Sequence, residues 1–214
     1  MKYRRETEAI IAAYHSIIVN KMRLNYNDIM NGPLIHEYLE RLSNLLRTEA
    51  RRSGTAYGLQ PVQLQALHYL AICNRYSDTP LAVTEYLGLT KGTVSQTLMV
   101  LENKGLIAKT GDKEDKRVVH LKVTRTGKRL VQKAFPAQLL RAVCTRLSEA
   151  QQQRVIAGMK TLLLACQEAN RMRSFGACHT CRHNQRTADG GYLCGLTQEP
   201  LSSDDIMRIC REHA

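Results

Sequence analysis

Aromatic residues are scarce in this 214-residue chain, which contains no tryptophan and only two phenylalanines. A hydrophobic core must therefore rely on Leu, Ile and Val. No apolar run approaches the roughly 20 residues that a membrane-spanning helix needs. The apolar stretch at 10–19 is interrupted by His15 and Ser16, and Glu6 and Glu8 lie where a secretory signal peptide would carry positive charge. We expect a cytoplasmic protein that does not enter a membrane.

Basic residues outnumber acidic ones, because the chain has 31 Lys and Arg but only 19 Asp and Glu. The net charge is therefore +12. Such an excess attracts polyanions, so nucleic acid and an anionic membrane surface are both candidate partners. The length allows one large domain or two small ones. The chain has no Ser/His/Asp grouping, no phosphate-cradling glycine loop and no pair of carboxylates in an apolar setting, which argues against an enzyme.

Residues 81–102 carry the most informative pattern of the chain. Residues 81–87 have the spacing of a short amphipathic helix. Gly88 predicts a tight break after it, because glycine adopts backbone angles that other residues resist. Residues 90–102 predict a second helix. This order of helix, break and helix is typical of a helix-turn-helix.

The second of these helices has two chemically different faces. Val94, Leu98 and Leu101 recur at helical spacing and are expected to face the core. The opposite face carries short donors and acceptors suited to base edges and phosphates in a major groove. The residues of this polar face are Thr90, Lys91, Thr93, Ser95, Gln96 and Thr97, of which the first five are candidate DNA contacts.

A β-hairpin is expected directly after the second helix. Gly105 marks the end of that helix. Two short runs rich in β-branched residues, 106–109 and 118–123, predict two strands, and the loop between them is polar and basic. Such a strand pair beside a DNA-reading helix is a wing, which carries an arginine to the DNA backbone or the minor groove. The predicted fold is therefore mainly α with a small β-hairpin wing, a winged helix-turn-helix.

The stretch LGLTKGTVSQTLMVLENKGLIAKTGDKEDKRVVHLKVTRTGKRL resembles the multiple-antibiotic-resistance regulator (MarR) family, and the resemblance covers roughly residues 33–170. It implies that bases are met by Thr93, Ser95 and Gln96. It also implies that Arg117 of the wing enters the minor groove and that Asp115 orients the wing loop.

One position departs from the family pattern. The usual wing has an arginine where this chain has Lys116, and a lysine gives a point charge rather than a planar fork. We expect Lys116 to contact DNA more loosely. Winged helices also serve as protein-interaction modules, which is the alternative interpretation of this segment.

Helices flanking the winged segment carry long apolar stripes, over 34–46 and 139–166. They hold more apolar surface than one small winged unit can cover, so we expect a homodimer. A two-fold dimer places two reading helices about 34 Å apart, which fits an inverted-repeat operator in double-stranded DNA. A monomer with a larger core is the alternative. The family resemblance implies a pocket for a small aromatic effector between the dimerisation helices and the winged unit.

Cysteines gather at the carboxyl end, where four of the seven lie within the last 37 residues in the spacing Cys-x2-Cys-x12-Cys-x15-Cys. A segment this small cannot build a sufficient core alone, so a metal or disulfides must stabilise it. A reducing cytosol disfavours structural disulfides. A turn is expected at 189–191, between Cys181 and Cys194. A short helix is expected to start at 202–205, before Cys210. We predict that four thiolates bind a metal: Cys178, Cys181, Cys194 and Cys210.

Two inorganic groups suit these four thiolates. Structural zinc sites usually have two short cysteine pairs, whereas this tail has one pair and two single cysteines. Four thiolates also hold iron–sulfur clusters, and this spacing is similar to that of high-potential iron–sulfur proteins. We favour an iron–sulfur cluster, 4Fe–4S before 2Fe–2S, and keep zinc as the alternative. Second-choice ligands are His179, His183 and His213. Four unligated, redox-active thiols are a third interpretation.

The other three cysteines, Cys73, Cys144 and Cys166, lie on apolar helical stripes, and we expect all three in the core, with a reactive sensor thiol as the alternative. The predicted organisation is an N-terminal helical extension at 1–32, a winged-helix and dimerisation domain at 33–172, and a metal-binding tail at 173–214.

Together the parts predict a sequence-specific transcriptional regulator, a repressor, whose DNA affinity depends on the metal or redox state of the tail. Three alternatives stay open. One is a regulator with a purely structural zinc tail that responds to an aromatic effector. Another is a thiol-redox enzyme that uses Cys178 and Cys181. The last is a nonspecific architectural DNA-binding protein, because phosphate contacts alone carry no sequence information.

Overall fold

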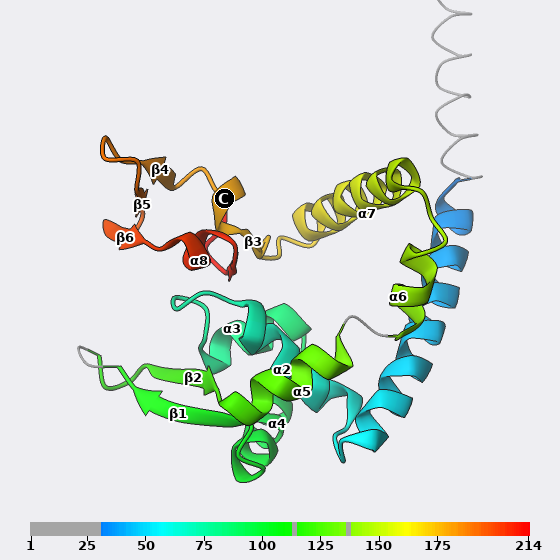
Figure 1. Cartoon of the computed structure of the whole chain (residues 1–214), viewed down its shortest axis with the longest axis horizontal. Coiled ribbons are helices and arrows are strands. Elements are labelled where there is room, and N and C mark those ends of the chain that lie inside the picture. The colour runs from blue at the N-terminus through cyan, green and yellow to red at the C-terminus, as the bar shows by residue number, and fades with distance from the viewer. Residues whose placement is uncertain (1–30, 113–114, 136–137) are drawn as a thin grey trace, which may run out of the picture. The chain divides into compact units, whose positions relative to one another are not determined.

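A computed structural model of the chain describes residues 31–112, 115–135 and 138–214 (Figure 1). The chain divides into two compact units, Met1–Thr48 and Glu49–Ala214. The expected apolar stripe of the N-terminal extension lies outside the described residues; it consists of Ile10, Ile11, Tyr14, Ile17 and Ile18.

Residues 31–56 are helical. Gly54 lies inside this helix, where a Cβ would meet the backbone oxygen of Leu59 at 2.4 Å. The chain leaves the helix at Gly58, whose φ of 63° is accessible to glycine at little cost. The apolar stripe of this helix is exposed in the single chain, at Leu34, Tyr38, Leu42, Leu45 and Leu46.

Three helices form the centre of the second unit: α2 (Pro61–Ile72), α3 (Pro80–Leu87) and α4 (Lys91–Asn103). Each start carries a local signal. Proline occupies the first turn of α2 and α3, where its missing N–H needs no partner. The threonine before α4, Thr90, accepts a hydrogen bond from the backbone N–H of Thr93. The predicted break between α3 and α4 is confirmed, because Gly88 is left-handed, with a φ of 63°.

The wing follows α4 as predicted. Strands β1 (Ile107–Gly111) and β2 (Val119–Val123) pair antiparallel, with Ile107 opposite Val123 and Gly111 opposite Val119. Helix α5 (Arg125–Ala134) then begins at Thr124, whose hydroxyl accepts from the N–H of Gly127 and donates to the carbonyl of Gly105. Thr124 therefore joins the start of α5 to the end of α4.

A core of aliphatic side chains holds these elements together. The predicted apolar face of α4 is confirmed, because Val94, Leu98 and Leu101 are all buried. Thr97 is a correction: we expected it on the polar face, yet it is only 4% exposed. The helical period turns position 97 toward the same side as Val94 and Leu101, and a threonine tolerates burial there better than a longer polar side chain. The other large core side chains are Leu64, Leu67, Tyr69, Val83 and Leu121.

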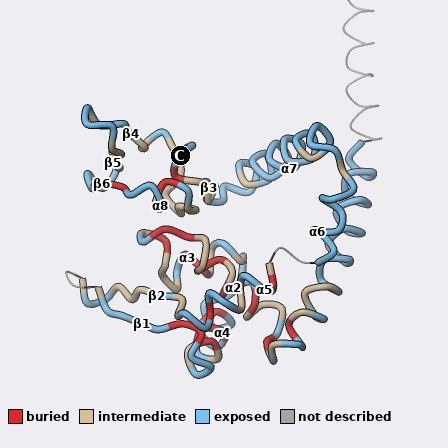
Figure 2. Tube along the Cα trace, viewed as in Figure 1, coloured by how far each residue is buried: buried red, intermediate tan, exposed pale blue. Residues whose placement is uncertain are grey.

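Two further helices, α6 (Gln138–Cys144) and α7 (Glu149–Ala169), have no buried residue (Figure 2). Helix α7 starts with a capping box, in which Ser148 and Gln151 exchange hydrogen bonds. Apolar side chains such as Met159 and Leu163 remain more than half exposed in the single chain. The expected core positions of Cys144 and Cys166 are therefore wrong for the single chain, where both are exposed.

The cysteine-rich tail is built from short elements. Strand β3 (Gly176–Ala177) pairs with β7 (Ile209–Cys210), and β4 (Asn184–Arg186), β5 (Tyr192–Cys194) and β6 (Glu199–Leu201) form a three-stranded antiparallel sheet. A 3-10 turn, η1 (Cys178–Thr180), follows β3. The expected turn near Gly190 is present, with a φ of 84°, and the expected short helix is α8 (Ser203–Ile206), capped by Ser202.

The tail packs against the winged helix within the second unit. The backbone N–H of Asn74 donates to the carbonyl of Ile209 at 2.9 Å. Arg211 makes two bonds to the carboxylate of Glu85 on α3, at 2.6 and 2.8 Å, and its backbone N–H donates to Ser77 Oγ at 2.8 Å. These bonds join the last strand of the tail to the loop at 73–79 and to α3.

Further contacts enlarge this interface. Tyr76 donates its hydroxyl to Glu199 at 2.6 Å, and Arg75 donates to the same carboxylate at 3.1 Å. Phe175 packs edge-on to Tyr86, with ring centroids 5.2 Å apart. The tail is therefore docked on the helix-turn-helix by hydrogen bonds, ion pairs and aromatic contacts together. No helix among residues 31–112, 115–135 and 138–214 is both long and apolar enough to cross a membrane.

Gly127 provides a test of the packing between α5 and the wing. A Cβ at this position would lie 2.3 Å from the backbone oxygen of Leu106 and 2.8 Å from Val123. Gly127→Ala is expected to lower the free energy of unfolding by about 1–3 kcal/mol, because neither backbone nor wing can move away freely. Gly92→Ala is the matched control in the first turn of α4, where the nearest atom is 4.0 Å away. Equal urea midpoints for the two variants would contradict the expectation.

Candidate nucleic-acid interface and cysteine cavity

The polar face of α4 is open to solvent. The residues predicted to meet DNA there are all exposed: Thr90, Lys91, Thr93, Ser95 and Gln96. Two of them also have a structural task. The Thr90 hydroxyl caps α4 and lies 2.9 Å from the hydroxyl of Thr93. This contact fixes both side chains at the first turn, where the partial positive charge of a helix end favours a phosphate.

The wing loop positions its arginine through a local ion pair. Asp115 accepts from Arg117 Nε and Nη2, each at 3.0 Å, and from the backbone N–H of Arg117 at the same distance. The hydrogen bonds from Arg117 lower the pKa of Asp115, so this carboxyl stays ionised. The Arg117 side chain is 91% exposed, and Lys116 beside it is also exposed. The geometry gives Asp115 the orienting position that the family resemblance implies.

The polar face of α4 and the base of the wing open on the same side. Lys91 and Ser95 of α4 line one hollow of about 960 Å³ together with Lys109 and Val119 of the wing. Lys109 is also paired with Glu102 at the end of α4, at 2.6 Å. One surface therefore combines short polar groups on a helix with cations on a hairpin, which is the arrangement that a groove and its phosphates require.

His120 is a residue that the sequence analysis missed. It lies on β2, with Nδ1 2.5 Å from a carboxylate oxygen of Asp78 and Nε2 3.1 Å from one of Asp112. These two carboxylates raise the pKa of His120, because the imidazolium donates from both ring nitrogens. Burial raises the pKa of Asp78 in turn. These contacts join β2 of the wing to the residues just before α3.

Strand pairing brings the four tail cysteines together. Gly176 lies opposite Cys210 in the β3–β7 pair, and Cys178 follows two residues later. Cys181 comes directly after the 3-10 turn, and its N–H donates to the carbonyl of Cys178 at 3.0 Å. In the second sheet Cys194 lies opposite Asn184, three residues after Cys181. Strand pairing thus brings Cys194 and Cys210 back toward the pair formed by Cys178 and Cys181.

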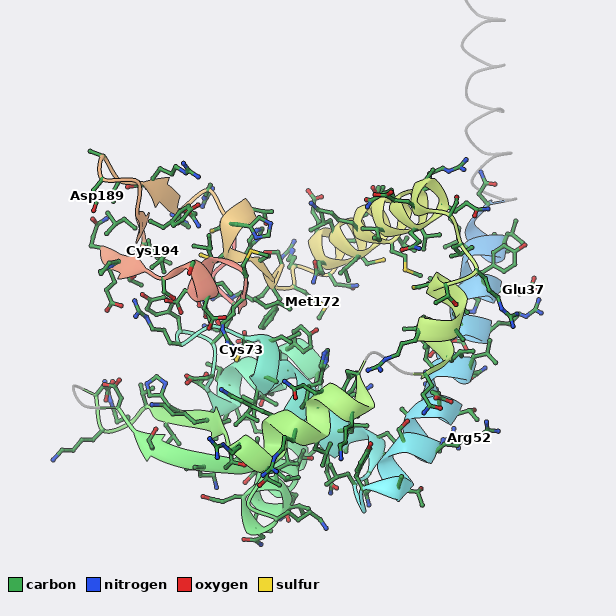
Figure 3. The ribbon with its side chains drawn as sticks, viewed as in Figure 1. Glu37, Arg52, Cys73, Met172, Asp189 and Cys194 are labelled. Atoms are coloured by element: carbon green, nitrogen blue, oxygen red, sulfur yellow. The ribbon has the colours of Figure 1, made fainter. Side chains whose placement is uncertain are left out.

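All four thiols line one cavity of about 380 Å³. Figure 3 labels Cys194 on β5 and Cys73 at the end of α2. The cavity is completed by Asn74 and Tyr76 from the loop at 73–79 of the winged helix. Within the described part of the chain, no three Cys, His, Asp or Glu side chains are grouped closely enough to hold a single metal ion. The four thiols therefore share one cavity without forming, in the described residues, a group that could hold a single ion.

Two of these thiols have shifted pKa values. Burial raises the pKa of Cys178 above its usual range. Burial would raise that of Cys194 too, but hydrogen bonds from the Thr197 side chain and from the N–H groups of Leu196 and Thr197 lower the pKa of Cys194. The thiolate is the form that binds metal. Cys194 is accordingly held in an environment that favours its anion.

The second-choice histidine ligands are placed differently from one another. His183 lines the cavity. His213 has Nδ1 3.1 Å from the hydroxyl of Ser174 and Nε2 2.9 Å from that of Thr180, so both of its nitrogens are engaged. His179 Nδ1 lies 3.2 Å from the carbonyl of Ile206. Of these three histidines, His183 is the one that lines the cavity with the sulfur atoms.

Cys73 behaves as the sequence predicts for a core cysteine. It is buried, and its Sγ lies 3.6 Å from the carbonyl of Leu70. Burial raises the pKa of Cys73 to about 12, which makes it a poor nucleophile.

Comparison with known proteins addresses the winged segment. A family model described as the MarR family matches residues 57–118. No match was found among curated proteins. A crystal structure of the S. aureus MepR–DNA complex is 26% identical, with a TM-score of 0.50, and the match covers 60% of this chain and 96% of that one.

Two other solved structures are similar over the same extent. Streptococcus pneumoniae FabT in complex with DNA is 25% identical with a TM-score of 0.52, covering 64% of this chain and 98% of that one. A MarR transcriptional regulator from Methanosarcina mazei Go1 is 16% identical with a TM-score of 0.56, covering 64% and 99%, and supports the fold alone. More than a third of this chain lies outside each match, although the relatives are matched almost end to end.

The His120 contacts predict a pH dependence of stability. Because its folded pKa is raised, the imidazolium stabilises the fold fully below the unfolded pKa near 6.5, and this contribution is lost as the pH rises through the folded value. The difference in unfolding free energy between the natural protein and His120→Gln should be larger at about pH 5.5 than at about pH 8.5. Urea unfolding at both pH values measures it, and a difference that is constant with pH would contradict the assignment.

Proposed function

We propose that the protein is a sequence-specific, DNA-binding transcriptional repressor with a winged helix of the MarR type, the family whose model matches residues 57–118. The observation that carries this proposal is the exposed polar face of α4 beside a wing whose Arg117 is held outward by Asp115. The net charge of +12 suits a polyanionic partner. MepR and FabT, which are similar in sequence and fold, have been crystallised with DNA.

In this proposal α4 enters the major groove. Ser95 and Gln96 meet base edges, and Thr93 supports them. Lys91 and the capped first turn at Thr90 contact phosphate, because a helix N-terminus attracts anions. Arg117 and Lys116 of the wing contact the adjacent minor groove or the backbone.

We further propose that two copies act together. Helix α7 spans Glu149–Ala169 without burying a residue, and side chains such as Ile156 and Leu163 are more than half exposed. A water-soluble helix with this much free apolar surface gains stability by packing on another helix. A two-fold dimer built on these helices would set two copies of α4 about 34 Å apart, on one face of an inverted repeat. Cys144 and Cys166 would then be covered by the partner.

For the tail we propose an iron–sulfur cluster bound by Cys178, Cys181, Cys194 and Cys210, 4Fe–4S before 2Fe–2S. The supporting observation is that the four thiols line one cavity without forming an ion-sized group in the described residues. A single zinc with bonds of about 2.3 Å would hold its sulfurs about 3.8 Å apart. A 4Fe–4S cluster separates them further, because each thiolate binds a different iron atom.

The cluster is proposed to control DNA affinity. The tail is docked on α3 and on the loop before it, so the bound group lies against the helix-turn-helix itself. A coupling free energy of about 1–3 kcal/mol between the cluster and DNA would change operator occupancy by about 5–150-fold. The docking contacts support a direct route from the tail through α3.

A thiol-redox enzyme is less well supported. Cys178 begins a 3-10 turn between very short strands, and burial raises its pKa, which weakens it as a nucleophile. Reactive Cys-x2-Cys motifs instead have a depressed pKa. MepR and FabT, which are similar to this chain, have been crystallised with DNA.

DNA recognition can be tested with duplexes selected by the full-length protein from a random pool. Arg117→Ala should weaken binding to all selected sequences alike. It should also reduce the slope of log affinity against log salt concentration by about 1, because one phosphate contact is lost. Gln96→Ala should relax the preference at one base pair, worth about 1–3 kcal/mol. Fluorescence anisotropy at several salt concentrations measures both. If Gln96→Ala weakened every sequence equally, its assignment to bases would be wrong.

The tail can be tested on protein purified without oxygen. We expect a brown protein containing iron and sulfide, and we expect selected duplexes to bind the loaded and metal-free forms with affinities that differ by about 5–150-fold. Cys194→Ser should remove the colour and abolish that difference, whereas Cys144→Ser, the matched control, should leave both. Colourless protein with one zinc per chain would favour a structural zinc tail and a regulator of small aromatic effectors.

A further inference from the structure

Asn74 is a buried polar residue with one unmatched group. It is 1% exposed. Its backbone N–H donates to Ile209, its carbonyl accepts from the N–H of Ser77 at 3.1 Å, and its side-chain Oδ1 accepts from the N–H of Tyr76 at 3.2 Å. The side-chain nitrogen Nδ2 has no hydrogen-bond partner. Buried donors are nearly always paired in proteins, so this one calls for an acceptor.

The orientation of this amide follows from its neighbour. The N–H of Tyr76 needs an acceptor, which Oδ1 provides. Turning the amide over would set two donors against each other, so the NH2 group must point away from Tyr76. Asn74 therefore presents a donor, and not an acceptor, on its free side.

Asn74 borders two hollows of the second unit. Asn74 lines the same cavity as the four tail cysteines. It also borders a wider hollow with Arg75 and Lys122, but that hollow is open to water, and Nδ2 is shielded from solvent. Besides sulfur, the cavity is lined by acceptors on His183, Asn184, Tyr76, Thr197 and Glu212. Several of these are already engaged: the Glu212 carboxylate pairs with Arg173 and Arg211, and the Tyr76 hydroxyl is bonded to Glu199 and Thr197. Thiolates and the sulfides of a cluster accept N–H hydrogen bonds, which tune such centres.

We propose that Asn74 donates a hydrogen bond from Nδ2 to a sulfur of the group bound in the four-cysteine cavity, and that this bond is the contact through which the helix-turn-helix senses that group. The inference rests on the proposed function of the tail. It adds to it a positioning residue that belongs to the winged helix and not to the cysteine-rich segment.

The loop that carries Asn74 leads directly to the DNA-binding elements. Asn74 is bonded to Ser77. The next residue, Asp78, accepts from the backbone N–H of Leu121 in the wing at 2.7 Å and holds His120 through its carboxylate. Helix α3 starts two residues further on. A change in the bond made by Asn74 therefore acts on a loop that both supports the wing and begins the helix-turn-helix.

A second amide provides a matched control. Asn184 lies in the tail, and its Nδ2 donates to the carbonyl of Cys178 at 3.2 Å and to Cys178 Sγ at 3.7 Å. Both amides thus serve the same cavity, but only Asn74 belongs to the winged helix. Removing either should loosen the bound group, whereas only the loss of Asn74 should disconnect that group from DNA binding.

The experiment compares Asn74→Ala, Asn74→Asp and Asn184→Ala with the natural protein. Asn74→Asp keeps the acceptor for Tyr76 and the size of the side chain, so it preserves the fold if alanine does not. The rate at which a chelator removes the bound iron or zinc should rise about tenfold or more in both Asn74 variants. The ratio of duplex affinities between loaded and metal-free protein should fall toward one. If the bound group is a cluster, its reduction potential should also fall, because a donor to sulfur is lost.

Asn184→Ala should release its metal faster than the natural protein but keep the affinity ratio. The proposed hydrogen bond would be wrong if a chelator removed the metal from both Asn74 variants at the rate of the natural protein. The proposed sensing role would be wrong if the affinity ratio were unchanged. If the metal-free variants bind the duplex as tightly as the metal-free natural protein, the winged helix is folded in those variants. Natural protein without iron, sulfide or zinc would instead refute the proposed function of the tail, and the inference with it, before any variant is made.

Discussion

The pairing of Arg211 with Glu85 is the constraint on which the rest of the tail depends. Arg211 follows Cys210, so the two bonds to Glu85 and the backbone bond to Ser77 fix the position of the fourth thiol from outside the cysteine-rich segment. The hydrogen bonds from Arg211 lower the pKa of Glu85, which keeps the pair charged. A segment of about 40 residues has too little apolar surface to hold such a geometry alone. The winged helix is therefore part of the wall around the sulfurs as well as the reader of DNA.

Much of the winged helix could be predicted because its signals are local. Gly88 and Gly105 adopt left-handed angles where the sequence predicted breaks, and Ser148 and Ser202 cap the helices that follow them. Each of these signals acts on residues within about four positions of it. The apolar face of α4 is likewise predicted from the local 3.6-residue period. The cysteine spacing predicted a shared site, and the thiols do line one cavity, although the identity of the group they bind stays a prediction.

What could not be predicted depends on contacts between distant residues or on a second copy. Asn74 looks like an ordinary polar residue in a turn, and only the return of Ile209 and Cys210 to the same loop gives its amide a role. His120 likewise needs Asp78, 42 residues earlier, to form its ion pair. The exposure of Cys144 and Cys166 follows from helices that have no partner within one chain. Periodicity identifies a face but not what covers it.

The distance along the chain between Glu85 and Arg211 also orders events during synthesis. These residues are 126 positions apart, so Arg211 is synthesised well after Glu85. The helices and hairpin at 57–134 draw their core from within that range, so they can fold before the tail exists. In the nascent protein the winged unit can thus form first, and the cysteine cavity is completed only when the tail docks on it.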